Sequence, residues 1–216
     1  MTTQNDFLSG LRLRLRDSDG RRWPNDELLA YLQAAVQEYS KSFPRLREQQ
    51  FVTSGNTRIY ALPSDLIGDQ IIEVAITGEG EADRERLVLR RSLVYRGTRW
   101  YEVVGQNLHF GWVVPAGLTV RVRYEATHVL PPTGDATIPK EDEEMIYVAA
   151  MAMAWQRLAG NDANLSRWKE EGRRDDSPII PIHVDLWNRY RHMVDQKRGG
   201  TSVLRRVRKR WQRPVR

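Results

Sequence analysis

Residues 145–155 form an unbroken apolar run, which constrains the fold more than any other part of the sequence. Four acids precede the run at positions 141–144, where the free N–H groups of a first helical turn favour negative charge. Gly160 follows as a stop signal, so the pattern predicts a helix over residues 141–160. A helix without a polar side must be covered from several directions, and we expect other segments to pack around it. Its small residues, which allow close approach, are Ala149, Ala150, Ala152 and Ala154.

Two further helices are expected earlier in the chain. Residues 6–16 fit either a strand, with alternating leucines and arginines, or a helix; we favour a helix capped by Asn5 or Asp6. Residues 23–43 begin with a proline, a capping asparagine and two acids, and apolar residues then recur at helical spacing. This second helix is the natural partner of the helix over residues 141–160.

Between residues 48 and 130 the hydrophobic period changes to that of short strands separated by turn residues. In the last segment, apolar side chains alternate with charged ones, which predicts one buried and one solvated face. The block therefore predicts an antiparallel β-sandwich or small barrel. Its expected strands are residues 50–53, 58–62, 71–77, 86–91, 100–104, 108–112 and 118–127.

The predicted fold class is α+β, with a helical core of about four to five helices and the β block inserted into it. Residues 1–47 and 131–197 supply the core and residues 48–130 the insertion. A short helix is expected over residues 162–172, and a final helix starts near Pro181 and ends at Lys197. Gly199 and Gly200 then free a basic C-terminal arm, residues 198–216.

The formal net charge of +6 is unevenly distributed. Nine of the 34 basic residues lie in residues 197–216, which hold no acid. Residues 1–196 carry the other 25 basic residues and all 28 acidic ones, a net charge of −3. A slightly acidic body with a basic end indicates a terminal interaction tail rather than a basic DNA-binding face.

The basic arm also contains apolar residues, at positions 203, 204, 207 and 211. In a helix these four would share one stripe that could dock into a partner's groove, while the arginines contact acids around it. A solvated, disordered tail is one alternative reading of the same residues. Two further alternatives are a contact with nucleic-acid phosphates and a contact with a membrane surface.

The sequence lacks the residues that several classes of catalytic and metal-binding site require. The sequence has no cysteine, which excludes disulfides and thiolate metal sites. His109, His128, His183 and His192 are scattered without metal-ligand spacing, and no serine lies in a nucleophile elbow. The clustered acids at 141–144 could hold a cation, but the start of a helix explains them better. Residues 78–83 are best explained as the tip of a hairpin. We expect neither an enzyme nor a bound metal or cofactor.

The order of these pieces resembles that of the head-to-tail connector adaptor proteins of tailed bacteriophages. The residues that carry the resemblance lie in residues 15–32, with Leu15-Arg16-Asp17 leading to Trp23-Pro24-Asn25-Asp26-Glu27. It continues through residues 62–66, 71–74 and 124–130, Ile138-Pro139, and the alanine-rich helix, and it covers about residues 8–195.

The resemblance implies a structural virion protein of the phage neck, made in the host cytoplasm. About twelve copies would form a ring beneath the portal protein, continue the channel for non-specific passage of DNA, and present a surface to a downstream stopper or tail protein. Members commonly reach the portal with a C-terminal segment, a role that suits the basic arm; no membrane is implied. The alternative function is a nucleic-acid-binding module that grips phosphates with this arm. The candidate portal-binding residues are Val203, Leu204, Arg205, Arg206, Val207, Arg208, Lys209, Arg210 and Trp211.

Overall fold

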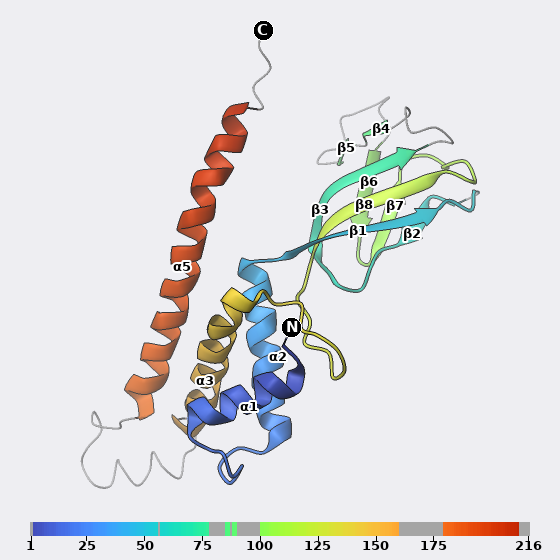
Figure 1. Cartoon of the computed structure of the whole chain (residues 1–216). Coiled ribbons are helices and arrows are strands. Elements are labelled where there is room, and N and C mark those ends of the chain that lie inside the picture. The colour runs from blue at the N-terminus through green and yellow to red at the C-terminus, as the bar shows by residue number, and fades with distance from the viewer. Residues whose placement is uncertain are drawn as a thin grey trace. The chain divides into compact units, whose positions relative to one another are not determined.

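The protein is described by a computed structural model, which covers residues 2–55, 57–77, 85–86, 88–89, 100–159 and 179–211 (Figure 1). The chain divides into two compact units, which we describe separately. Met1–Ser42 and His128–Arg216 form the helical unit, and Phe43–Thr127 forms the β unit. The helix expected over residues 162–172 and the hairpin tip expected over 78–83 lie outside the described residues.

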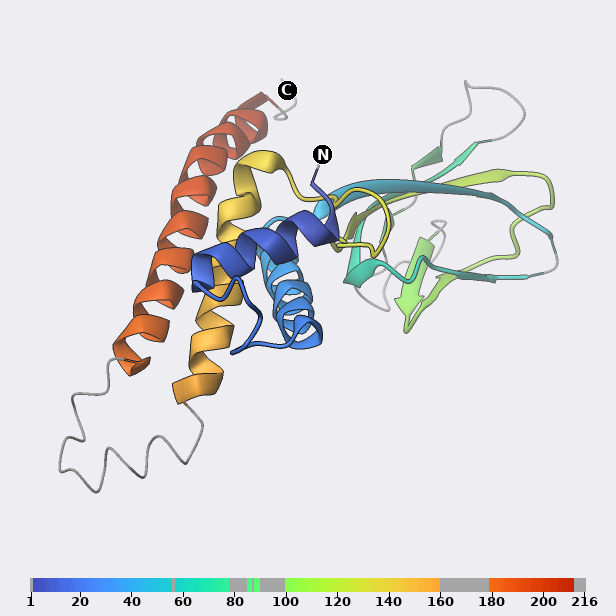
Figure 2. The same cartoon turned by 60° about the horizontal axis from the view of Figure 1, so that its bottom comes forward.

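The helical unit is built around one apolar helix. Its described part contains α1 (Gln4–Leu15), α2 (Asn25–Ser42), the short 3-10 helix η1 (Lys140–Asp142), α3 (Glu143–Ala159) and α5 (Ile179–Trp211). Helices α1, α2 and α5 all pack against α3 (Figures 1 and 2). The four alanines of α3 are completely buried, as its sequence predicted. Within the described residues, every helix is too short or too polar to span a bilayer.

Helix α1 forms as predicted, but the expected cap was wrong. Thr3 is the N-cap, and its side chain accepts a hydrogen bond from the backbone N–H of Asp6. The Asp6 carboxylate accepts the Thr3 N–H in return, at 2.8 Å. This reciprocal capping box satisfies two backbone donors at once, which neither Asn5 nor Asp6 could do as the cap. The helix therefore starts earlier than its apolar pattern indicates.

The last helix continues past the position where we expected it to end. Helix α5 spans 33 residues, through Gly199 and Gly200, and ends at Trp211. Two glycines each cost about 1 kcal/mol relative to alanine in a helix, yet the backbone hydrogen-bond ladder needs no side chain. Residues 196–198 before the pair are good helix formers and residues 201–203 after it are weaker ones, and the helix nevertheless continues through both. The predicted hinge at the glycines is therefore wrong in this structure.

One buried carboxylate joins three elements of the helical unit. Asp142, at the end of η1, is only 2% exposed. It accepts a 2.5 Å hydrogen bond from the Tyr39 hydroxyl on α2 and pairs with the Lys197 ammonium on α5. Burial, and then the bond to Asp142, raises the pKa of Tyr39 above its usual range. The acids that precede α3 were expected to serve its first turn alone, whereas Asp142 ties α2 and α5 to it.

The β unit consists of two four-stranded sheets. In the first, the strand order is β1 (Arg45–Val52), β8 (Thr119–Ala126), β3 (Leu66–Thr77), β4 (Glu85–Arg86). In the second, it is β2 (Ile59–Ala61), β7 (Asn107–Phe110), β6 (Trp100–Val104), β5 (Val88–Leu89). Neighbouring strands run antiparallel as predicted, except that β5 and β6 are parallel.

A single hydrophobic core lies within the β unit and includes residues of both sheets. Val120, Val122 and Tyr124 of β8 face it, together with Leu108 and Phe110 of β7. The alternation predicted for the last strand is thereby confirmed. Neither sheet closes on itself, so the described strands form no barrel.

Replacing Asp142 with alanine should lower the free energy of unfolding of the helical unit by about 3 kcal/mol, because the Lys197 ammonium and the Tyr39 hydroxyl lose their shared acceptor. Urea denaturation followed by far-ultraviolet circular dichroism measures this loss. Asp195→Ala removes an exposed acid of α5 and should cost under about 0.5 kcal/mol. Equal losses in both variants would contradict the role given to Asp142.

Candidate functional site

The residues that the sequence singled out for partner binding lie in the last turns of α5. Lys197 contacts Asp142, immediately before the start of α3 at Glu143. Residues 199–211 of α5, which we call the projecting end, therefore run past the N-terminal end of α3 (Figure 1). At 1.5 Å per residue, the projecting end is about 20 Å long. Side chains from residue 200 onward are outside the described part, so their contacts stay predictions.

The helical backbone is compatible with the predicted apolar stripe. With a turn of about 100° per residue, positions 203, 204, 207 and 211 fall within about 100° of the helix circumference. The five basic positions between them lie elsewhere around the helix, three of them on its opposite side. Docking of this stripe into a partner groove with acidic edges stays a prediction.

The first part of α5 is fixed firmly to the helical core. Tyr190 and Val194 are 4% and 6% exposed. Arg189 pairs with Glu144 at the start of α3 at 3.1 Å, and the Arg198 guanidinium donates to the Ser42 hydroxyl at 3.1 Å. Burial, followed by the charge of nearby Glu38, raises the pKa of Tyr190 to about 12. These contacts set the direction in which the projecting end continues beyond the N-terminal end of α3.

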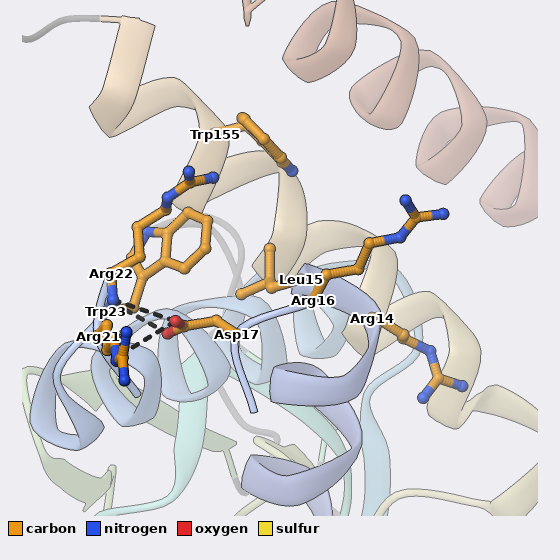
Figure 3. A pocket seen from close by; sticks show the side chains of 8 residues that line it. All are labelled: Arg14, Leu15, Arg16, Asp17, Arg21, Arg22, Trp23 and Trp155. Atoms are coloured by element: carbon orange, nitrogen blue, oxygen red, sulfur yellow. Dashed lines mark hydrogen bonds between the residues drawn. The ribbon is translucent and has the colours of Figure 1, made fainter. Parts of the chain in front are cut away.

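A second candidate site lies where the loop between α1 and α2 meets α3, and sequence reasoning missed it (Figure 3). It is a pocket of about 480 Å³. The indoles of Trp23 and Trp155 meet edge to face beside it, with ring centroids 5.9 Å apart. The lining residues are Arg14, Leu15, Arg16, Asp17, Arg21, Arg22, Trp23 and Trp155.

The loop beside this pocket is folded around the Asp17 carboxylate. Asp17 accepts backbone N–H groups from Arg21, Arg22 and Trp23, each at 3.1 Å (Figure 3). It also accepts a bond from the Arg12 guanidinium at 3.2 Å. Burial acts to raise the pKa of Asp17, but the backbone bonds and the Arg12 charge outweigh it and hold that pKa below its usual value. Asp17, the one acid among the described residues that line the pocket, thus already has its partners.

The remaining charge around the pocket is positive. Arg16, Arg21 and Arg22 are exposed, and the one acid paired with them in the described residues is exposed Asp19, 3.8 Å from Arg21. Arg14 pairs with Glu144 at 2.9 Å. Planar guanidinium groups beside aromatic walls suit a carboxylate or phosphate group. The sequence signal was the run at residues 21–23, of which we had interpreted only Trp23, as part of a helix start.

The histidines do not meet in the described part of the chain. His128 is buried and bonds through Nδ1 to the Thr137 carbonyl oxygen at 2.8 Å, a packing role. Among the described residues, no three potential metal-ligating side chains come together.

A family model described as SU10 adaptor protein matches residues 2–177, more than three quarters of the chain. The match ends just before α5 begins at Ile179, so the role of α5 must be argued from this chain itself. No curated protein matches the sequence.

Replacing Asp17 with asparagine should destabilise the helical unit at neutral pH and make its stability less sensitive to acid. The native pKa of Asp17 is lowered, so its ionised form stabilises the fold above pH 4, and this contribution is lost as pH falls through the native pKa. Thermal melts from pH 7 to pH 2.5 should show the difference between the two proteins shrinking below about pH 4. A difference that is constant with pH would refute the assignment.

Proposed function

The chain belongs to the SU10 adaptor protein family, a phage head-to-tail adaptor family, and from this membership we propose that it forms a ring in the virion neck between the portal and the tail. A ring of twelve copies would continue the DNA channel and offer its far side to a stopper or tail protein. In this proposal the protein is structural, and it acts by joining the portal to the tail rather than by catalysis. The membership of the family is the observation that carries it.

We further propose that the projecting end of α5 docks the portal. Support comes from its construction, because contacts at Asp142, Glu144 and Ser42 hold the base of α5 while the helix continues for thirteen residues beyond Arg198. Seven of the last sixteen residues are basic and none is acidic. An arm with this composition fits an acidic, apolar-lined groove on a partner.

A ring arrangement would multiply the strength of such a contact. Each arm buries only a short apolar stripe, and its exposed ion pairs contribute little singly. When twelve arms sit on one ring, engagement of the first raises the effective concentration of the others. A weak single contact then gives a stable joint, while free subunits stay detached from the portal.

The charge of the body is compatible with passage of DNA. Residues 1–196 carry a net charge of −3, so this part of the chain as a whole does not attract phosphates. A lumen formed by such residues would let DNA slide without tight binding.

Deleting residues 201–216 should abolish binding to purified portal rings while leaving the thermal midpoint of the protein within about 2 °C of the wild type, because the packed part of α5 is retained. Electron microscopy of the mixed proteins measures attachment. Attachment of the truncated protein at wild-type levels would refute the docking role of the arm without touching the family assignment.

Charge reversal tests the arm without removing it. Arg205→Glu with Arg206→Glu should weaken portal binding at least about tenfold, since two cations at a groove become anions. The matched control, Arg58→Glu with Arg191→Glu, changes the net charge equally at exposed positions outside the projecting end and should bind as the wild type. If both pairs weaken binding equally, overall charge and not the arm is responsible.

The wild-type protein and the variant that lacks residues 201–216 also test the nucleic-acid alternative. Steeply salt-dependent affinity of the free protein for DNA, lost on deletion of residues 201–216, would support a phosphate-gripping arm instead.

A further inference from the structure

Strand β1 leaves one long backbone edge open. It pairs on one side with β8 over all eight of its residues, Arg45–Val52, and no strand of the described residues pairs with its other side. Its residues are exposed except for half-buried Arg45 and Phe51. It contains no proline and no bulge, two of the devices that protect an edge strand from further pairing.

The register with β8 identifies the backbone groups on this open edge. Thr53 donates its N–H to the Leu118 carbonyl at 2.8 Å, and the same register continues through Val52 opposite Thr119. Hydrogen-bonded pairs alternate along an antiparallel ladder, so Phe51, Gln49 and Arg47 point their backbone groups towards β8. The intervening residues, Leu46, Glu48, Gln50 and Val52, point theirs away from the sheet.

The charges of β1 do not oppose an incoming strand, because each is already paired within the unit. Arg45 and Arg47 contact the Asp65 carboxylate at 3.3 and 2.7 Å. Glu48 pairs with Arg121 of β8 at 3.2 Å. The uncharged side chains of the edge include two large apolar ones: Leu46 is 63% exposed and Val52 is 65% exposed.

We propose that β1 pairs with β1 of a second copy of this chain, antiparallel and about a two-fold axis at Gln49. This register places Leu46 opposite Val52 of the other copy, and Glu48 opposite Gln50. Both exposed apolar side chains then gain an apolar neighbour, and every outward backbone group gains a hydrogen-bond partner. The two sheets join into one continuous sheet.

Neighbouring registers fit less well. A shift of the axis to residue 48 places Glu48 opposite Glu48, and like charges directly opposite each other are unfavourable. A shift to residue 50 leaves Leu46 opposite Ser54, outside the strand. The sequence of β1 therefore complements itself best in the register centred on Gln49.

The proposed contact is distinct from ring formation. A two-fold contact closes on itself and cannot propagate from copy to copy around a cyclic ring. It belongs to the free protein, in which two copies would shield each other's open edge. It uses residues of the β unit alone, whereas portal docking uses the projecting end of α5.

Paired charges test both the contact and its register. Analytical ultracentrifugation of the wild type should show a concentration-dependent shift from 25.1 kDa towards twice that mass. Leu46→Lys with Val52→Lys places two ammonium groups opposite each other twice and should weaken association at least about tenfold. Leu46→Lys with Val52→Glu places opposite charges together and should restore association to near the wild-type strength.

The control and a second disrupting variant guard against misfolding. Ile72→Lys with Val104→Lys changes residues that are 50% and 49% exposed on other strands and should leave association unchanged. Gln50→Pro removes an outward N–H without removing a bond to β8, and should also abolish pairing. All variants are first shown to melt cooperatively. A wild type that stays monomeric at the highest concentrations, or a double-lysine variant that associates normally, overturns the proposal.

Discussion

The buried Asp142 carboxylate is the interaction on which the helical unit depends. A charge without partners in an apolar interior would cost several kcal/mol, so Tyr39 and Lys197 must lie beside it in the folded state. These two residues come from α2 and α5, which are far apart in sequence. Burying one carboxylate at the start of α3 therefore fixes how α5 is placed along α3, and with it the point where the helix runs past the core.

In the β unit, too, one carboxylate joins separate elements. Asp65 accepts the Tyr124 hydroxyl at 3.0 Å and the guanidinium groups of Arg45 and Arg47. Burial tends to raise the pKa of Asp65, but these bonds and charges hold it below its usual value. Tyr124 belongs to the central strand β8 and the arginines to β1, so the carboxylate holds the edge strand in register. The first residues of β1 are thus held against β8 by contacts of their own side chains.

The sequence predicted the elements whose signals are local. Periodicity located α2, α3 and most strands, and the alanines of α3 correctly indicated burial on several sides. The sequence did not predict contacts between residues that are far apart along the chain. Asp142 stands among three other acids and looks like a helix-start residue, and only tertiary packing selects it for burial. The pocket beside Trp23 draws residues from two helices and a loop, so no single window of sequence contains it.

The two glycines of α5 illustrate the same limit, and they bear on how an arm of this kind works. Isolated helices of about thirteen residues are marginal in water because the first turn is costly to form. The projecting end avoids this cost, since it extends a helix that the core has already nucleated. Glycine lowers its intrinsic stability by about 1 kcal/mol per residue, an amount that burial of an apolar stripe in a partner's groove can offset. In the proposed docking, burial in a partner's groove would therefore also stabilise the turns that follow the two glycines.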